Sequence, residues 1–97
     1  MLTDYLEEIK IRCGIASQIN VYDSEITGLL DDCEHDMLAS GVTQSVLEST
    51  DHAQQALTAA ALYVKAYIGN DRSDSDMYLE MYRNKVFRLT LEDENVE

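Results

Sequence analysis

The sequence predicts an all-α fold, a small bundle of four main helices. Apolar residues recur at spacings of three and four along most of the chain, which is the pattern of amphipathic helices. Proline is absent, and glycines and capping residues divide the chain into pieces of helical length. With 97 residues the chain has room for one domain, and its core must be thin because so short a chain buries only about 60 to 65% of its unfolded surface.

The first helix is expected at about residues 4 to 13, with Thr3 as its N-cap and Gly14 as its terminator. Its apolar positions are Leu2, Leu6, Ile9 and Cys13. The following residues, 15 to 22, are short of helical pattern and predict a loop. The apolar side chains expected to turn inward from this loop are those of Ile15, Ile19 and Val21.

The second helix is expected at about residues 24 to 40, capped by Asp23 or Ser24 and closed by Gly41. Its apolar stripe consists of Ile26, Leu29, Leu30, Cys33, Met37 and Leu38. Gly28 lies inside this helix, where glycine costs about 1 kcal/mol relative to alanine. We therefore expect another backbone to pack closely against it.

Residues 42 to 48 are predicted to form only a short apolar turn and a corner, since the segment is too short for an independent helix. The third helix, at about residues 51 to 68, is rich in alanine, and we expect it to be the central one, capped at Asp51 and ended by Gly69. Its small side chains allow neighbouring helices to approach closely.

The fourth helix is expected at about residues 74 to 90, with Ser73 and Asp76 as a capping box. Its cations are placed in its last two turns, at Arg83, Lys85 and Arg88. Its apolar face is expected to comprise Met77, Tyr78, Met81, Tyr82, Val86 and Leu89. Residues 1–91 would thus form a single helical domain, and residues 92–97 an acidic, disordered tail.

The charge balance argues against adhesion to nucleic acid or to a membrane. Nineteen acidic side chains oppose seven basic ones, which gives a formal net charge of −12. Such a surface repels duplex phosphates and anionic lipid headgroups. No run approaches the roughly 18 to 20 apolar residues of a membrane span, and no basic-then-apolar leader begins the sequence, so we expect the protein to be made in the cytoplasm. Cys13 and Cys33 occupy isolated apolar positions and are expected to be free thiols.

Catalytic constellations are not apparent, and we expect neither an enzyme nor a cofactor or metal site. The dipeptide His35-Asp36 is found in metal-dependent phosphohydrolases, but those sites need several further ligands, and His52 is the only other histidine. The loop from Asp71 to Asp76 is acidic, but the calcium-binding helix-loop-helix pattern needs Gly at its sixth position and Glu at its twelfth, where this chain has Asp76 and Tyr82. A capped loop between helices explains the same residues.

Tyrosine dominates the aromatic residues, with six Tyr, one Phe and no Trp. Tyrosine suits half-wet surfaces, and together with arginine it is enriched at protein interfaces. The candidate protein-interaction residues are Tyr63, Tyr67, Tyr78, Tyr82, Arg83 and Arg88. The alternative is that the four tyrosines line the contact between the third and fourth helices.

The C-terminal half has a distinctive order of features. The segment Ala60-Ala-Leu-Tyr-Val-Lys-Ala-Tyr-Ile-Gly69 is followed by an acidic loop, then by Tyr78 and Tyr82, then by Val86-Phe-Arg-Leu-Thr-Leu91. This order resembles the phage head-tail connector (DNA-packaging) family, and the N-terminal half agrees in layout. The resemblance covers most of the chain.

The resemblance implies a structural subunit of the virion neck. Such a subunit would assemble into a ring, expected to be a dodecamer, on the portal protein after DNA packaging, and would form the platform for the next neck or tail protein. DNA would pass nearby without being read, and a negative surface facing the channel would keep it from adhering. By the same analogy, residues 42 to 50 and the acidic tail are expected to order on assembly, because neither segment carries enough apolar surface to fix itself.

The main alternative is a phage-encoded inhibitor that mimics DNA, because a small acidic helical protein can array carboxylates like phosphates. A mimic should carry long rows of carboxylates. In this chain the acidic residues are interrupted by cations, at Arg72, Arg83, Lys85 and Arg88, so the connector is the preferred interpretation.

Overall fold

The fold was analysed in a computed structural model that describes residues 2–68 and 73–92. Within this part of the chain the structure contains five α-helices and one short 3-10 helix, and no strands, so the all-α prediction is confirmed. The elements are the 3-10 helix η1 (Leu2–Tyr5), α1 (Leu6–Arg12), α2 (Asp23–Ala39), α3 (Gln44–Glu48), α4 (Ala53–Tyr67) and α5 (Ser75–Glu92).

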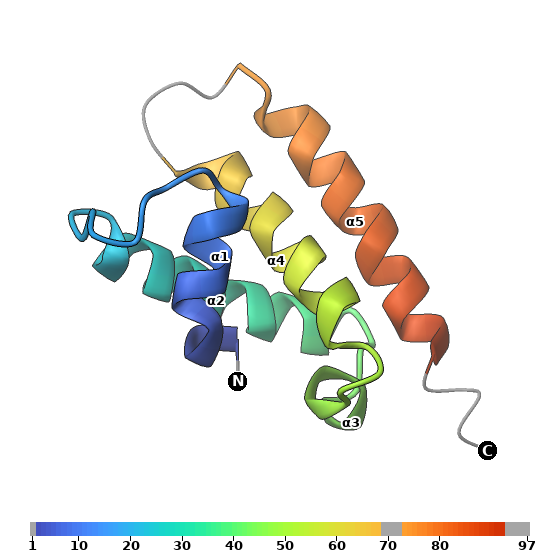
Figure 1. The fold of residues 1–97 in the computed structure, drawn as a ribbon. Helices are drawn as coiled ribbons and strands as arrows, with labels where there is room; N and C mark the ends of the chain where they lie inside the picture. The colour runs from blue at the N-terminus through green and yellow to red at the C-terminus, as the bar shows by residue number, and fades with distance from the viewer. Residues whose placement is uncertain (1, 69–72, 93–97) are drawn as a thin grey trace.

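Helix α4 is central, as predicted. It packs along α5 on one side and also contacts α1, α2, α3 and η1 (Figure 1). Its buried residues include five alanines, Ala56, Ala59, Ala60, Ala61 and Ala66, whose small side chains allow the neighbouring helices to come close. The core is completed by apolar side chains of every other element, among them Leu2, Ile9, Ile26, Leu30, Met37, Val46, Val86 and Leu89.

The N-terminal segment differs from the prediction in detail. Thr3 lies inside η1 and does not cap α1, whose preceding residue Tyr5 makes no side-chain capping bond. Gly14 adopts a φ of 78°, the left-handed conformation expected of a residue that closes a helix. The inward orientation expected for the loop was wrong for Ile19 and Val21, since Val21 is 77% exposed.

Helix α2 begins at Asp23, one residue earlier than predicted, and Tyr22 precedes it without a side-chain cap. The predicted caps were therefore wrong. Leu38 is exposed, because it lies outside the stripe of Ile26, Leu30, Cys33 and Met37 that faces the core. The packing expected at Gly28 is also absent: a Cβ added there would meet nothing within 4 Å. Gly41, with a φ of 108°, does follow the end of the helix.

The segment after Gly41 contains more structure than expected. Residues Gln44–Glu48 form the short helix α3, capped by Thr43, whose Oγ1 accepts a hydrogen bond of 3.3 Å from the Val46 amide. Val42 and Val46 are both buried in the core. The segment therefore contributes two valines to the core, and its ordering on assembly stays a prediction.

Helix α4 starts at Ala53, and Asp51 is not its cap; His52 precedes the helix without a side-chain capping bond. The predicted terminator Gly69 and most of the predicted tail lie outside the described residues. Helix α5 runs to Glu92, two residues further than predicted, so its last turn contains no cation. Its N-terminus is tied to α4, because the Ser75 hydroxyl donates a hydrogen bond of 2.6 Å to the Ala66 carbonyl.

Candidate protein-interaction surfaces

Three of the four candidate tyrosines meet between α4 and α5. The ring centroids of Tyr63 and Tyr67, one turn apart on α4, are 4.9 Å apart, and Tyr63 packs edge-on against Tyr82 of α5 at 5.1 Å. Both geometries are favourable for aromatic rings. This cluster belongs to the contact between the two helices, and Tyr82 itself is only 3% exposed.

The Tyr82 hydroxyl joins α5 to α2. It donates a hydrogen bond of 2.6 Å to Oδ2 of Asp36, while the Cys33 thiol lies 3.7 Å from it as a weak donor. Burial raises the pKa of Tyr82 above its ordinary value, and the neighbouring Cys33 and Asp36 raise it further. The hydroxyl therefore stays protonated at neutral pH and acts as a structural donor.

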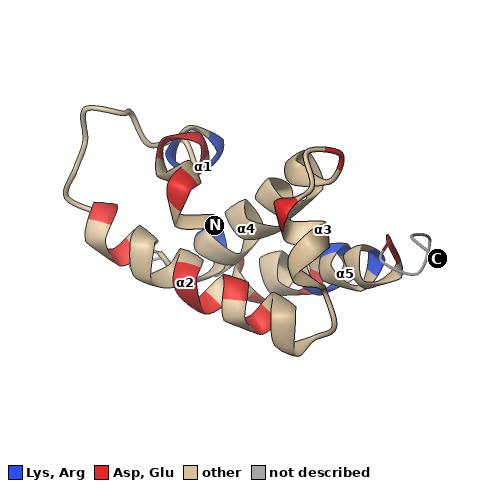
Figure 2. Cartoon of the chain, turned by 90° about the horizontal axis from the view of Figure 1, so that it is seen from below, with Lys and Arg blue, Asp and Glu red and all other residues tan. Residues whose placement is uncertain are grey.

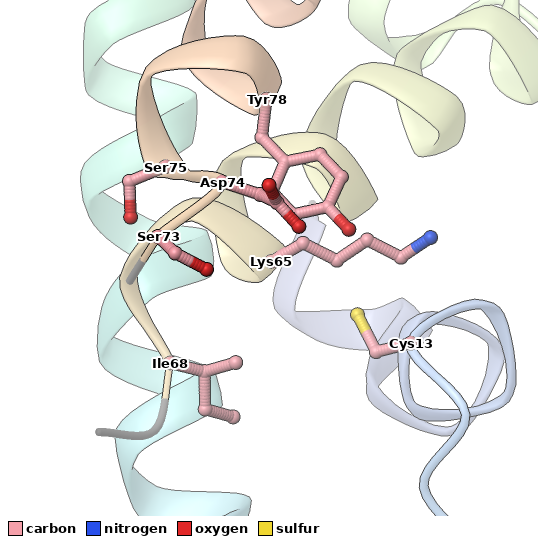
Figure 3. Close-up of a pocket in the computed structure, with 7 residues that line it drawn as sticks. All are labelled: Cys13, Lys65, Ile68, Ser73, Asp74, Ser75 and Tyr78. Atoms are coloured by element: carbon pink, nitrogen blue, oxygen red, sulfur yellow. The ribbon is translucent and has the colours of Figure 1, made fainter. Parts of the chain in front are cut away.

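Tyr78 lies apart from this cluster, in a hollow between the end of α1, α4 and the start of α5 (Figure 3). The Lys65 ammonium lies 5.9 Å from the centroid of its ring, a cation–π distance. The hollow is also lined by Cys13, Ile68, Ser73, Asp74 and Ser75. It brings one amine, one thiol and one carboxylate into the same region.

The chemistry of the two cysteines does not favour nucleophilic catalysis. Both are free, Cys33 buried and Cys13 half-buried. Burial raises the pKa of Cys33 to about 12, and desolvation also raises the pKa of Cys13, against which Lys65 acts only partly. Since the thiolate is the reactive form, the raised pKa values keep both side chains in the less reactive thiol form at neutral pH.

The two candidate arginines lie on the exposed side of α5. Arg83 lines a groove between α5 and the end of α2, next to the exposed ring of Phe87 and the buried Tyr82. Arg88 lines a second hollow together with Gln55 of α4 and Lys85, Leu91 and Glu92 of α5. None of the cations at 83, 85 and 88 makes an ion pair with another residue that the structure describes.

Helix α5 also exposes apolar side chains. Met77 and Met81 were predicted to face the core, but they are 50% and 44% exposed, as are Phe87 and Leu91 to a similar or greater degree. The buried side of α5 is narrower than predicted, because only Tyr82, Val86 and Leu89 are fully buried. A helix with flexible apolar side chains and unpaired cations on its outer side is suited to contact another protein.

Helix α2 carries the opposite charge. Acidic side chains recur along its length, and none of its residues is Lys or Arg (Figure 2). The six acids are Asp23, Glu25, Asp31, Asp32, Glu34 and Asp36. Three of them have structural roles: Asp36 accepts from Tyr82, Glu34 accepts a 2.9 Å hydrogen bond from the Leu2 amide, and Asp23 pairs with a lysine of α1. Helix α2 thus carries acids and no Lys or Arg, whereas α5 carries three cations, Arg83, Lys85 and Arg88, together with three acids, Asp76, Glu80 and Glu92.

The sequence reasoning missed one buried cation. Lys10 is fully buried, with its Nζ 2.9 Å from Oδ1 of Asp23, and it donates a 3.1 Å hydrogen bond to the Ser17 carbonyl. It lies one position after Ile9, on the side of α1 that the loop of residues 15 to 22 covers. The sequence offers only a weak signal for this pair: a lysine near the end of the first helix and an aspartate at the start of the second. Such a combination is too common to predict a buried ion pair.

Neither a metal site nor a membrane-spanning element emerges from the part of the chain that the structure describes. No group of three or more His, Cys, Asp and Glu side chains there is placed to share a metal ion. None of the helices described is both long and apolar enough to cross a bilayer.

These features define a class of protein: a small all-helical domain whose distinctive surfaces are outward helix sides of opposite charge. The chain belongs to the phage connector protein family, a structural family, since the model of that family matches residues 5–96, nearly the whole chain. The resemblance inferred from residues 60 to 91 is thereby confirmed. No curated protein and no solved structure matches the chain.

Proposed function

We propose that this protein is a head-tail connector subunit of the virion neck. Several copies, expected to be twelve, form a ring on the portal protein after DNA packaging, and the ring is the docking platform for the next neck or tail protein. The observation that carries the proposal is the family match over residues 5–96, which includes every α-helix of the fold.

The surface of the chain is consistent with assembly. A thin core gains stability from neighbouring subunits, and α5 exposes methionines and arginines that have no partner among the described residues of the chain. Of the candidate residues, Arg83 and Arg88 are the most exposed, and we assign them to contacts with other proteins. Tyr63, Tyr67 and Tyr78 are half-buried, and their hydroxyl groups can form hydrogen bonds at the solvent-exposed edge of such a contact.

The acidity of the chain fits a protein that lies beside DNA without binding it. A formal net charge of −12 opposes retention of duplex DNA. In the proposed ring, acidic side chains that face the channel prevent DNA from adhering as it passes.

Binding to the portal protein tests this function. The purified chain is mixed with the portal protein of the same phage, and the complex is isolated by size-exclusion chromatography. We expect the two proteins to co-elute at physiological salt, and we expect no retention of duplex DNA by the chain alone. Absence of portal binding would contradict the proposal. Competition with DNA for a nucleic-acid-binding enzyme by the monomer would indicate the mimic.

A further inference from the structure

The outer sides of α5 and α2 include exposed side chains of opposite charge, and neither side is covered by another described element. We define the α5 outer face by four exposed residues at spacings of four, four and three: Met77, Met81, Lys85 and Arg88. We define the α2 outer face by five exposed residues at similar spacings: Ser24, Gly28, Asp31, Asp32 and His35. Residues at such spacings share one side of a helix.

The α5 outer face has an apolar half and a basic half. Met77 and Met81 are 50% and 44% exposed, and they occupy the N-terminal part of the face. Lys85 and Arg88 occupy the C-terminal part, next to a hollow that they line together with Leu91. Glu92 lines this hollow too, but its printed ion-pair contact is with His52, at 3.9 Å, and not with either cation.

The α2 outer face has small residues in its N-terminal half and acidic residues in its C-terminal half, just as the α5 outer face has apolar residues first and basic residues second. Ser24 and Gly28 come first, and the space beside Gly28 is open, with nothing within 4 Å of an added Cβ. Asp31 and Asp32 follow one turn later, and Asp31 forms its ion-pair contact, at 3.9 Å, with the exposed His35 of the same face. Glycine in the middle of a helix is unfavourable, and no contact within the chain explains it.

We propose that the α5 outer face of one copy docks on the α2 outer face of a second copy, as the lateral contact of the ring; this rests on the proposed function. Each face spans twelve residues, from 77 to 88 and from 24 to 35, or about 16 Å of helix. When the two helices run parallel, Met81 lies over Gly28 and Lys85 lies beside Asp32. In the same register Arg88 lies opposite His35, one turn beyond Asp31 and Asp32.

Two observations favour a second copy as the occupant. The charges of the two faces are opposite, so that each copy supplies the complement of the next (Figure 2). The two faces are also different surfaces of one chain, so the contact is heterologous: it leaves one free face of each kind and continues from copy to copy until the ring closes. Such a contact does not end at a dimer.

Charge exchange tests the contact. One variant carries Lys85→Glu and Arg88→Glu, and the other carries Asp31→Lys and Asp32→Lys. Assembly of each is measured by mass photometry, alone and on the portal protein. For either variant alone we expect the dissociation constant between copies to rise about tenfold or more, because like charges then face each other. An equimolar mixture of the two should assemble again, since every contact in an alternating ring pairs opposite charges.

Gly28→Leu tests the shape of the contact without disturbing the fold. The added side chain enters open space in the monomer, so its helical circular dichroism and thermal unfolding should show no loss of stability. Assembly should nevertheless fall about tenfold or more, because the side chain occupies the place of Met81. The matched control is Glu48→Lys with Asp51→Lys, which changes net charge as much as the α2 variant does but lies at the α3 corner; it should assemble as the unmodified chain does.

The outcomes separate this contact from the function on which it rests. Rings from both charge variants and from Gly28→Leu would refute the contact and leave the connector function standing. Loss of assembly in the single variants without recovery in the mixture would also refute it. Failure of the unmodified chain to assemble, alone or on the portal, would overturn the proposed function and this contact together.

Discussion

At the scale of single residues, Gly14 and Gly28 separate two effects of glycine. An added Cβ meets nothing within 4 Å at either position, but Gly14 has a φ of 78° while Gly28 lies within a regular helix. Steric space is therefore the same, and only the backbone conformation differs. Alanine is disfavoured in the left-handed region and favoured in a helix.

We predict opposite effects of the same substitution at these two sites. Gly28→Ala should raise the free energy of unfolding of the monomer by about 0.5 to 1 kcal/mol, because alanine restricts the unfolded chain and suits the helix. Gly14→Ala should lower it by about 1 to 2 kcal/mol because of backbone strain. Urea denaturation measures both; effects of equal sign would contradict the backbone assignment.

The Tyr82 hydroxyl predicts a dependence of stability on alkaline pH. Its pKa is raised in the folded state from an ordinary value of 10.0. The unfolded chain therefore loses this proton first, and the stability that Tyr82 contributes is complete below pH 10 and is lost as pH rises above it. In Tyr82→Phe, the decline of unfolding free energy above pH 10 should be shallower by about 1.4 kcal/mol per pH unit.

Cys33 and Tyr63, whose pKa values are raised to about 12, remain in this variant and continue to contribute above their ordinary values of 9.0 and 10.0. The measurement is a series of urea titrations between pH 8 and 11, in the native protein and in Tyr82→Phe. If the unfolding free energy fell equally with pH in both proteins, folding would not raise the pKa of Tyr82, which would contradict the prediction.

At the scale of elements, helical periodicity predicted the positions of the long helices well, because burial of one stripe decides where a helix forms. It could not predict the ends. Thr3, Asp23 and Asp51 are good capping residues by type, but each lies inside or ahead of an element whose start is determined by packing of Leu2, Ile26 and Ala56. Capping preferences are worth about 1 kcal/mol, which tertiary packing exceeds.

The candidate site was predictable in composition but only partly in geometry. Tyr63, Tyr67 and Tyr82 do meet, but the hydroxyl of Tyr82 is held by Asp36 from a helix 46 residues away in sequence, and no periodicity within one helix reveals such a partner. The exposure of Met77 and Met81 was missed for a similar reason. A stripe broad enough to include Met77 and Met81 has the pattern of a core face, and the sequence does not show how much of that stripe the neighbouring helix α4 covers.

The Lys10–Asp23 pair holds α1 and its loop against the start of α2, and it predicts unequal effects of its two halves. Asp23→Asn leaves the fully buried ammonium only the distant carboxylate of Glu7, at 3.9 Å and mostly exposed, and should lower the free energy of unfolding by about 3 kcal/mol. Lys10→Met leaves only Asp23, whose side chain is 30% exposed and can be hydrated, and should cost about 1 kcal/mol.

Glu25→Gln, at an exposed position of the same helix, is the control and should change stability by no more than about 0.5 kcal/mol. Thermal and urea unfolding of the three variants give the comparison. Equal losses of unfolding free energy in Asp23→Asn and Lys10→Met would contradict this prediction. They would show that leaving the Lys10 ammonium unpaired costs no more than leaving the Asp23 carboxylate unpaired.

At the scale of the whole molecule, the separation of charge is the property that links fold to function. The chain has a net charge of −12, yet α5 presents cations on its outer side while α2 presents only acids. If the charges were mixed evenly over the surface, the net negative charge would make two copies repel each other in every relative orientation. In the proposed ring, the cations of α5 and the acids of α2 would let a strongly acidic protein contact its own copies while its remaining surface repels DNA.

Electron microscopy of the purified protein, alone and after addition of the portal protein of the same phage, shows whether copies of the chain form a ring. We expect closed rings of a single stoichiometry, either in the isolated protein or on the portal, with α2 of each copy next to α5 of its neighbour. A chain that remains monomeric in both preparations would contradict this expectation.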